Sequence, residues 1–437
     1  MNILQIIPGS GGSFYCGNCL RDSKYFDALR KQGHHVVKIP MYLPLFSDER
    51  DIDTIPVFYG AVSIYLKQMY PVFRKSPPWF DQLLNSKPLL KIAARQAGST
   101  RAKGLEDMTV SMLLGEEGKQ SEELERMVDW IADNYQPDVI HLSNALLLGI
   151  AQRLKQRLNV PVFCSLQDEN TWVDVMRPSY REKVWSLMSE KAGFVDKFVS
   201  VSNYYAELSK QRMHLPNEKV HTIYLGVDPM DYQYISSAEK ERVIGFISRM
   251  SYENGLDILV EAFTLLKKKP GFEDVKLMIT GGYTGDDKKI LRQVRRTLKN
   301  NHLSHEVIFH QRFEGGERLS FFDKVSVISV PVRNGEAFGI YLTESMASGI
   351  PVIQPSVGAF PEIINTSGGG DLYQHNTPEG LSEAWEHYLN NTNNYDALSK
   401  QARQGVEKAF NIHNLAEKYI ALYQESINHP AYASVSK

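Results

Sequence analysis

Residues 331–353, PVRNGEAFGIYLTESMASGIPVI, constrain the fold of this chain more than any other segment. A largely apolar run at 325–330 comes before them and predicts a buried parallel strand. Gly349 predicts the end of a helix, and the residues after it begin another strand. This order of strand, loop, short helix and strand indicates an open α/β sheet. Such sheets bind ligands at the carboxyl ends of their strands.

Two carboxylates eight residues apart, Glu336 and Glu344, stand at that end of the sheet. We expect Glu336 in the loop and Glu344 on the helix, so the two need not meet at one point. Gly339 lets backbone approach a ligand closely, and the start of the helix offers free N–H groups to an anion. The segment therefore predicts a hydroxyl-rich anionic ligand, with amides for phosphate and carboxylates for sugar hydroxyls.

The same segment resembles the Glu-x7-Glu signature of the retaining glycosyltransferases of family 4. The Ala-Phe-Gly and Met-Ala-x-Gly-x-Pro-Val-Ile sequences that accompany this signature are also present. The resemblance implies the GT-B architecture, an α/β fold of two doubly wound parallel-sheet (Rossmann-like) domains facing a cleft. It also implies that a hexose passes from a nucleoside diphosphate sugar to an acceptor hydroxyl with retention at the anomeric carbon.

The resemblance assigns roles to the residues of the signature. Glu336 would hold donor-sugar hydroxyls near the reacting carbon, and Glu344 would bind the ribose hydroxyls. Ala337, Phe338 and Gly339 would bind the donor, with the N–H groups near Phe338 and Gly339 stabilising charge on the leaving diphosphate. No metal and no cofactor are implied, because the UDP- or GDP-linked sugar is itself a substrate.

One departure from the family concerns the loop after the predicted strand 242–248. The family usually has an Arg and, five residues later, a Lys, and both hold the diphosphate. Here Arg249 is kept and Asn254 takes the place of the Lys, so a neutral amide replaces a cation. Gly282, after the next strand, and Arg312 are expected beside the nucleotide. The departure motivates an alternative, a catalytically weakened homologue that binds a nucleotide sugar or a partner chain.

The first strand, 2–7, leads into a glycine-rich loop that ends at Gly12. This loop is not the Gly-x-Gly-x-x-Gly of a dinucleotide site. It resembles the Gly-Gly loop at the same place in the glycosyltransferases, where Gly12 would face the donor phosphate or the acceptor. Cys16 and Cys19 form a Cys-x-x-Cys, which is open to a redox or zinc role or to simple packing beside the first helix.

Polar residues follow two further strands of the first half. Gln167 and Asp168 come after the strand 161–166, and Ser202 ends the strand 197–202. The family often has His where Gln167 stands. Gln cannot act as a general acid or base, so we expect a hydrogen bond to donor sugar or acceptor. Asp168 is expected either to face the cleft or to cap the following turn, and Ser202 to contact an acceptor.

The alternation of predicted strands and helices is interrupted between residues 51 and 118. Residues 67–103 carry eight Lys or Arg and one acid, with interleaved aromatic side chains. This insertion fits an acceptor site with aromatic stacking, a patch for anionic lipid, or a helical segment with a solvated basic face. Nucleic acid is disfavoured because no recognition motif accompanies the charge.

Length and composition set the remaining bounds. A chain of 437 residues predicts two or three domains, which we place at 1–228 and 242–412, with a linker at 229–241. The helix at 413–437 is expected to cross back to the first domain. With 49 basic and 51 acidic residues there is no overall attraction to nucleic acid. No apolar run approaches a membrane span, and three cysteines favour the cytoplasm, either free or peripheral at the inner face of the membrane.

Two other enzyme classes compete for the paired acids. A two-carboxylate glycoside hydrolase also uses two acids, but a loop-plus-helix context fits nucleotide-sugar binding better. A nucleotide-sugar epimerase on the same scaffold would need a general acid and a general base, and the sequence places neither. Transfer to a growing polysaccharide or a lipid-linked acceptor would suit the basic aromatic insertion.

Overall fold

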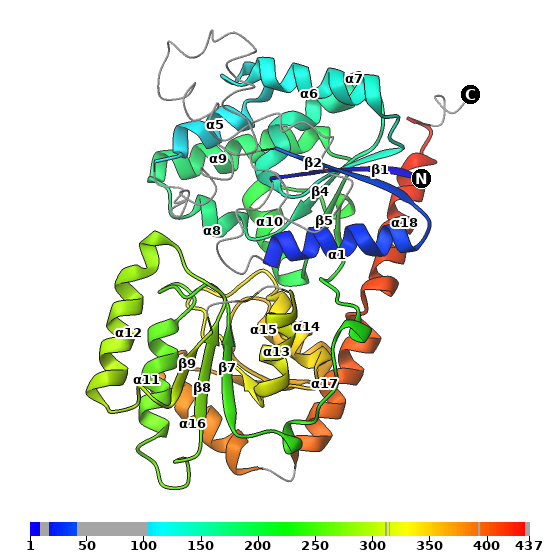
Figure 1. The fold of residues 1–437 in the computed structure, drawn as a ribbon. Helices are drawn as coiled ribbons and strands as arrows, with labels where there is room; N and C mark the ends of the chain where they lie inside the picture. The colour runs from blue at the N-terminus through cyan, green and yellow to red at the C-terminus, as the bar shows by residue number, and fades with distance from the viewer. Residues whose placement is uncertain (9–16, 42–103, 311–312, 314, 392–393, 433–437) are drawn as a thin grey trace. The chain divides into compact units, whose positions relative to one another are not determined.

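The computed structural model describes residues 1–8, 17–41, 104–310, 313, 315–391 and 394–432 (Figure 1). The chain divides into two compact units. Unit 1 holds Met1–Gly12, Tyr25–Ile223 and Ala416–Lys437, and unit 2 holds Ser13–Lys24 and Tyr224–Leu415. Each unit contains a parallel sheet with helices, so the expected α/β class with two Rossmann-like domains is confirmed.

The sheet of unit 1 has the order β2-β1-β3-β4-β5-β6 in the described part of the chain, and every pair is parallel. The strands are β1 (Asn2–Ile7), β2 (His35–Pro40), β3 (Val139–Leu142), β4 (Val162–Leu166), β5 (Lys197–Ser200) and β6 (Val220–Thr222). All residues of β3 and β4 are buried, as expected for strands covered on both faces. The strand order reverses between β1 and β3, which makes their carboxyl ends the switch point of the sheet.

Helices cover this sheet. They are α1 (Gly17–Lys31), α5 (Glu106–Leu113), α6 (Ser121–Asn134), α7 (Ala151–Leu158), α8 (Glu169–Val173), α9 (Pro178–Lys191), α10 (Asn203–Met213) and α18 (Ile412–Ile427). The segment before α7 is a 3-10 helix, Ala145–Ile150. Asn144 caps it by accepting a bond from the Leu146 N–H.

The later part of α18 belongs to unit 1 and is held there by a buried polar contact. The Tyr423 hydroxyl lies 2.6 Å from Nδ1 of His141 on β3, and Nε2 of His141 lies 2.6 Å from the Ser165 hydroxyl on β4. The Tyr423 ring also meets Phe163 edge-on, with ring centroids 4.8 Å apart. A residue 282 positions away in sequence thus completes the core of this sheet.

The sheet of unit 2 has the order β12-β11-β10-β7-β8-β9, again parallel throughout the described residues. Its strands are β7 (Val243–Ile247), β8 (Lys276–Thr280), β9 (Val307–Phe309), β10 (Val327–Ile328), β11 (Val352–Pro355) and β12 (Gly370–Tyr373). This is the order of a dinucleotide-binding fold, with its reversal between β7 and β10. The loops that follow these two neighbouring strands therefore open at the switch point.

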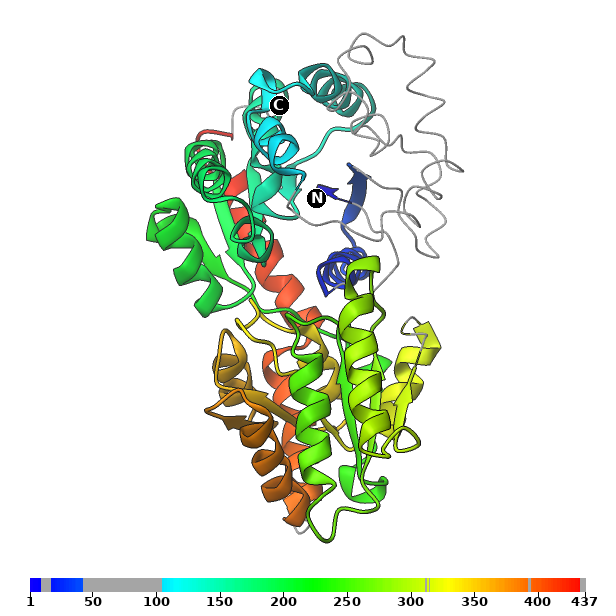
Figure 2. The ribbon, with the colours of Figure 1, turned by 90° about the vertical axis from the view of Figure 1, so that its left-hand side faces the viewer.

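Two groups of helices cover unit 2. On one side α11 (Leu256–Leu266) packs against α12 (Lys288–Asn300) and α16 (Pro378–Asn390). On the other, α17 (Tyr395–Ala409) packs against α14 (Ile340–Ala347) and α15 (Phe360–Ser367), as the two views show (Figures 1 and 2). The short helix α13 (Gly315–Lys324) leads into β10. No helix among the described residues is long and apolar enough to cross a membrane.

Candidate functional site

The loop between β10 and α14 carries Glu336 and is clamped from two sides. Arg333 forms a two-pronged ion pair with Asp257 on α11, at 3.0 and 2.8 Å, and its guanidinium lies over the Tyr252 ring. The backbone carbonyl of Glu336 accepts a hydrogen bond from the Ala359 N–H at 3.0 Å. These contacts fix the backbone that presents the Glu336 carboxylate.

Glycine is required at the crossing of this loop with the next one. Gly335 has a φ of +74°, and a Cβ there would lie 2.7 Å from the Cα of Gly358. Gly339 has a φ of +84° and immediately precedes α14. A Cβ on Gly339 would lie 3.0 Å from Oε2 of Glu336, so the carboxylate stands beside the amide-rich start of the helix.

Glu344 lies on α14, as expected, and its side chain is fully buried. The Tyr232 hydroxyl donates a 2.7 Å hydrogen bond to Oε1, and Nε of Arg318 on α13 lies 3.2 Å from the same oxygen. Burial, and then the charge of Glu344, raise the pKa of the Tyr232 hydroxyl well above its usual range. Sequence reasoning missed both partners, which lie 112 and 26 residues from Glu344.

Arg249 follows β7, and one side of its guanidinium is bound within unit 2. Nε and Nη2 donate to the two carboxylate oxygens of Asp287 at 2.9 and 3.0 Å, and Nη2 also donates to the Thr284 hydroxyl at 2.8 Å. Asp287 is buried and accepts from the N–H and hydroxyl of Thr284 in a capping box just before α12. The fork fixes the direction of Arg249, whose side chain stays 31% exposed.

Asn254 closes the loop in which it lies. Its amide nitrogen donates to the Ser248 hydroxyl at 2.8 Å and to the carbonyl of Arg249 at 3.0 Å. Both donor hydrogens of that nitrogen are therefore used inside the loop. Where the family has a mobile cation, this chain has a short side chain that holds the Arg249 backbone.

Gly282, after β8, joins the same region. Its carbonyl accepts a 2.9 Å hydrogen bond from the Met250 N–H. The neighbouring Gly281 has a φ of +118°, and a Cβ there would lie 2.1 Å from the Ser248 carbonyl oxygen. The structure thus brings Arg249, Asn254 and Gly282 together at the carboxyl ends of β7 and β8. Arg312 lies outside the described residues, and so does Gly12.

The three residues expected in unit 1 occupy different kinds of positions. Gln167 is buried and donates from its side chain to the Ser143 carbonyl at 2.6 Å. Asp168 has a φ of +54° and stands at the N-cap of α8, but its side chain makes no capping bond there. Ser202 is fully buried and caps α10 by accepting from the Tyr205 N–H at 3.0 Å, and its contact with an acceptor stays a prediction.

Glu169 is a buried acid that the sequence analysis did not single out. Its carboxylate accepts from the N–H of Ala145 at 2.9 Å, the N–H of Gln167 at 2.8 Å and the Tyr205 hydroxyl at 2.7 Å. Burial raises the pKa of this carboxyl, while these hydrogen bonds act in the opposite direction. Glu169 thus fixes the turn that presents Gln167 and Asp168 after β4.

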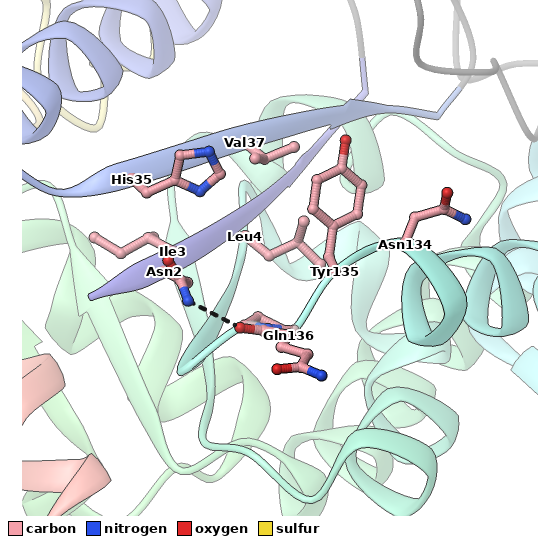
Figure 3. A pocket seen from close by; sticks show the side chains of 9 residues that line it. Asn2, Ile3, Leu4, His35, Val37, Asn134, Tyr135 and Gln136 are labelled. Carbon is pink, nitrogen blue, oxygen red and sulfur yellow. Dashed lines mark hydrogen bonds between the residues drawn. The ribbon is translucent and has the colours of Figure 1, made fainter.

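Figure 3 shows a shallow pocket at the other end of the unit 1 sheet. It lies at the start of β1 and β2 and is lined by residues that include Asn2, His35 and Tyr135. Asn2 donates there to the Gln136 carbonyl at 3.2 Å. Because ligands of such sheets bind at the carboxyl ends, this pocket is separate from the candidate site.

Metal and cysteine chemistry receive little support from the described residues. Among them no group of three His, Cys, Asp or Glu side chains is placed to hold a metal ion. Cys164 on β4 is buried, and its thiol donates to the Ser165 carbonyl at 3.3 Å. Cys16 lies outside the described residues, as does the side chain of Cys19, so the role of the Cys-x-x-Cys stays open.

The chain matches two family models that meet near the boundary between the units. The model of the glycosyl transferases group 1 matches residues 232–405, and that of glycosyltransferase family 4 matches residues 110–230. The chain is 24% identical over 308 residues to N-acetyl-alpha-D-glucosaminyl L-malate synthase of Bacillus anthracis, covering 68% of this chain and 76% of that protein. It is 23% identical over 319 residues to the uncharacterized glycosyltransferase MJ1607 of Methanocaldococcus jannaschii, covering 70% and 79%.

Solved structures show the same fold at low sequence identity. Sucrose-phosphate synthase from Thermosynechococcus elongatus has a TM-score of 0.69 at 18% identity, covering 97% of this chain and 98% of that one. Anabaena Alr3699/HepE in complex with UDP and glucose has a TM-score of 0.67 at 15% identity, covering 97% and 99%. The protein is therefore an enzyme of the glycosyltransferase class with two GT-B-type domains. Within it, residues 232–405 are similar to the glycosyl transferases group 1 and residues 110–230 to glycosyltransferase family 4.

Proposed function

We propose that this enzyme is a retaining hexosyltransferase that uses a nucleoside diphosphate sugar and an acceptor hydroxyl on a glycan, a lipid-linked or a small molecule. The observation that carries the proposal is the placement of Arg249 and Glu336. They follow β7 and β10, the neighbouring strands between which the strand order of unit 2 reverses. A cation for phosphate and a carboxylate for sugar hydroxyls thus stand where such sheets bind nucleotides.

Each residue of the loop then has a chemical task. Arg249 and the N–H groups at Phe338 and Gly339 stabilise the charge that develops on the departing diphosphate. Glu336, beside Gly339, accepts hydrogen bonds from donor-sugar hydroxyls and orients the anomeric carbon. The donor and the acceptor are the two substrates, and the proposed mechanism uses no resident cofactor.

Glu344 is the proposed ligand of the ribose hydroxyls, and its burial adds a condition. Tyr232 and Arg318 hold the carboxylate at one oxygen, Oε1. Because the side chain has no exposed surface, ribose reaches it only if the neighbouring backbone or side chains open locally. We therefore assign Tyr232 and Arg318 as positioning residues that direct Glu344.

UDP is the first nucleotide to test. Solved structures of Anabaena Alr3699/HepE contain UDP, UDP with glucose, or UDP-glucose, and they share this fold. The neutral Asn254 favours a second candidate, a protein that binds the donor but transfers the sugar slowly or not at all. Its amide is bound to Ser248 and Arg249, so no cation stands at that position for the diphosphate.

One experiment separates these candidates. The full chain is incubated with UDP-glucose and other UDP- and GDP-sugars with water as the acceptor, released nucleotide is measured, and the anomeric configuration of the freed sugar is read by proton NMR before it mutarotates. We expect release from one donor, a product of retained configuration, and a rate reduced on the order of 100-fold in Glu336→Gln. Glu379→Gln, an exposed acid on α16, is the control and should keep the rate.

Inversion at the anomeric carbon would contradict the retaining mechanism. Binding of a nucleotide with no release from any donor would favour the second candidate. An unchanged rate in Glu336→Gln would show that the reacting carbon lies elsewhere.

A further inference from the structure

Helix α12 carries an uncommon concentration of positive charge. Its thirteen residues, KKILRQVRRTLKN, include six cations and no acid. At about 100° per residue, the six cations fall within an arc of about 120°. The opposite side buries Ile290, Leu291, Val294 and Leu298 against unit 2. We call the exposed side the α12 basic face; it consists of Lys288, Lys289, Arg292, Arg295, Arg296 and Lys299.

The cations of the α12 basic face have no acidic partners among the residues that the structure describes. In the described part of the chain none of the six forms an ion pair, and their recorded contacts are of other kinds. Nε of Arg292 donates to the Lys288 carbonyl at 3.3 Å, and Arg295 lies over the Phe309 ring at 5.1 Å. In helix α17, by contrast, Lys400 and Arg403 each form an ion pair with an acid four residues away.

This arrangement has an electrostatic cost that an anionic partner would remove. Like charges at i and i+4, such as Arg292 and Arg296, repel each other on a helix. The whole chain has a net charge of −2, so the positive charge is a local feature of this face. An external anion that spans the helix would offset the repulsion along its full length.

Apolar side chains are exposed at both ends of the same segment. Tyr283, 47% exposed, comes just before the turn that leads into α12. Ile308, 43% exposed, lies on β9, the edge strand that follows α12. Both views show α12 on the outside of unit 2, on the side away from α17 (Figures 1 and 2). The apolar face of α12 itself is buried in unit 2, so only these two flanking side chains are exposed to add apolar contact to the attraction of the cations for anionic headgroups.

We propose that the α12 basic face binds the surface of a membrane that contains anionic lipid. A helix of this length spans about 20 Å, longer than a single nucleotide diphosphate, so the face suits an extended array of anions. The cations lie on the convex side of one helix, whereas single-stranded nucleic acid is typically held in a basic groove with stacked aromatic side chains. Clusters of four to eight Lys or Arg on an amphipathic helix are typical of binding to anionic headgroups.

The test compares vesicle binding by the full chain and two triple variants. Arg292→Gln, Arg296→Gln and Lys299→Gln together remove three charges from the α12 basic face. Lys183→Gln, Lys408→Gln and Lys418→Gln remove three exposed charges elsewhere and form the matched control. Sedimentation is measured with vesicles of phosphatidylcholine alone and with added phosphatidylglycerol. UDP titration of each variant checks that unit 2 remains folded.

We expect the wild-type chain and the control to bind only the anionic vesicles, more weakly as salt rises. The α12 variant should bind them about tenfold or more weakly, with UDP binding unchanged. Equal vesicle binding by the α12 variant and the wild type would overturn the proposal and place any lipid contact elsewhere. It would also be overturned if the wild type bound RNA or DNA but not the anionic vesicles. Neither result would bear on the donor site, since none of the three substituted residues belongs to it.

Discussion

At the scale of single residues, the candidate donor site depends on how side chains constrain one another. Arg249 is directed by the buried Asp287, and Asn254 holds the carbonyl of Arg249. Glu344 is directed by Tyr232 and Arg318. The groups proposed to meet the ligand therefore have few alternative conformations, which lowers the entropy lost on binding.

Asn254→Lys tests whether the missing cation limits donor binding. The new ammonium would extend past the loop toward the diphosphate, at the loss of two hydrogen bonds from the Asn254 amide. We expect UDP to bind about three- to tenfold more tightly, because the Lys variant adds a charge-assisted hydrogen bond to the diphosphate that the wild type lacks. Asn254→Met introduces a side chain about as long as lysine but without its charge, and this variant should bind UDP more weakly than wild type. Calorimetric titration measures both, and equal affinities of the two variants would show that the position does not face the diphosphate.

At the scale of elements, a tight crossing of two loops positions Glu336, the proposed catalytic carboxylate. Gly335 and Gly358 pass so closely that neither tolerates a side chain. The turn after β4 is held differently, by the buried Glu169, whose carboxylate accepts hydrogen bonds from two N–H groups and a hydroxyl. Both loops carry candidate residues at the carboxyl ends of strands.

Gly335→Ala tests the rigidity of the Glu336 loop. A Cβ at a φ of +74° is strained and would lie 2.7 Å from the Cα of Gly358, so the loop must move. We expect the free energy of unfolding to fall by about 1–3 kcal/mol and UDP-sugar turnover to fall with it. Gly316→Ala in α13 meets nothing within 4 Å and should be neutral or slightly stabilising. Chemical denaturation and turnover measure both, and equal behaviour of the variants would contradict the strain argument.

Lys240, just before β7, ties its segment to the end of α13 and gives a pH prediction. Its ammonium donates to the carbonyls of Phe322 at 2.8 Å and Val325 at 3.1 Å, and burial lowers its pKa to about 8. In the unfolded chain the pKa is about 10.4. The folded state therefore binds fewer protons between these values, and the contribution of Lys240 to stability rises with pH across that window.

The corresponding measurement is the melting temperature at pH 7 and pH 10. Lys240→Met removes the buried charge, so the melting temperature of the wild type should rise relative to that of this variant as the pH rises. Lys240→Arg stays charged at both pH 7 and pH 10, so its melting temperature should show no such rise relative to that of Lys240→Met. A difference between wild type and Lys240→Met that does not change with pH would contradict the argument.

At the scale of the whole molecule, the sequence predicted the class of fold and the location of the signature, because both depend on local patterns. Buried apolar runs and glycine stops are short-range signals, so most strands and the loop and helix positions of Glu336 and Glu344 were confirmed. The partners of Glu344 were not predictable, since Tyr232 meets it only through the folded chain. Ser202 was predicted as the last residue of a strand, but β5 ends at Ser200 and Ser202 caps α10. The sequence pattern did not show where the strand stops.

The division into units places the end of α18 in unit 1, and Tyr423→Phe tests its contribution. The substitution removes the hydroxyl 2.6 Å from His141 and leaves a buried ring nitrogen with one partner fewer. We expect unit 1 to lose about 1–2 kcal/mol of stability, seen as a lower melting temperature. UDP binding in unit 2 should be unchanged. A loss of UDP affinity without a change in melting would show that the contact serves the donor site instead.

Calorimetric titration with UDP and GDP tests the central claim most directly, that unit 2 binds a nucleoside diphosphate at the carboxyl ends of β7 and β10. The variants are Arg249→Gln and the double variant Arg249→Gln with Asp287→Asn. Arg249→Gln leaves the buried Asp287 carboxylate without its cation and should lose both affinity and about 1–3 kcal/mol of stability. The double variant should regain much of the stability but not the affinity. One nucleotide that binds the wild type and binds both variants at least about tenfold more weakly would fulfil the prediction. No binding of either nucleotide to the wild type, or equal affinity in all three proteins, would contradict it.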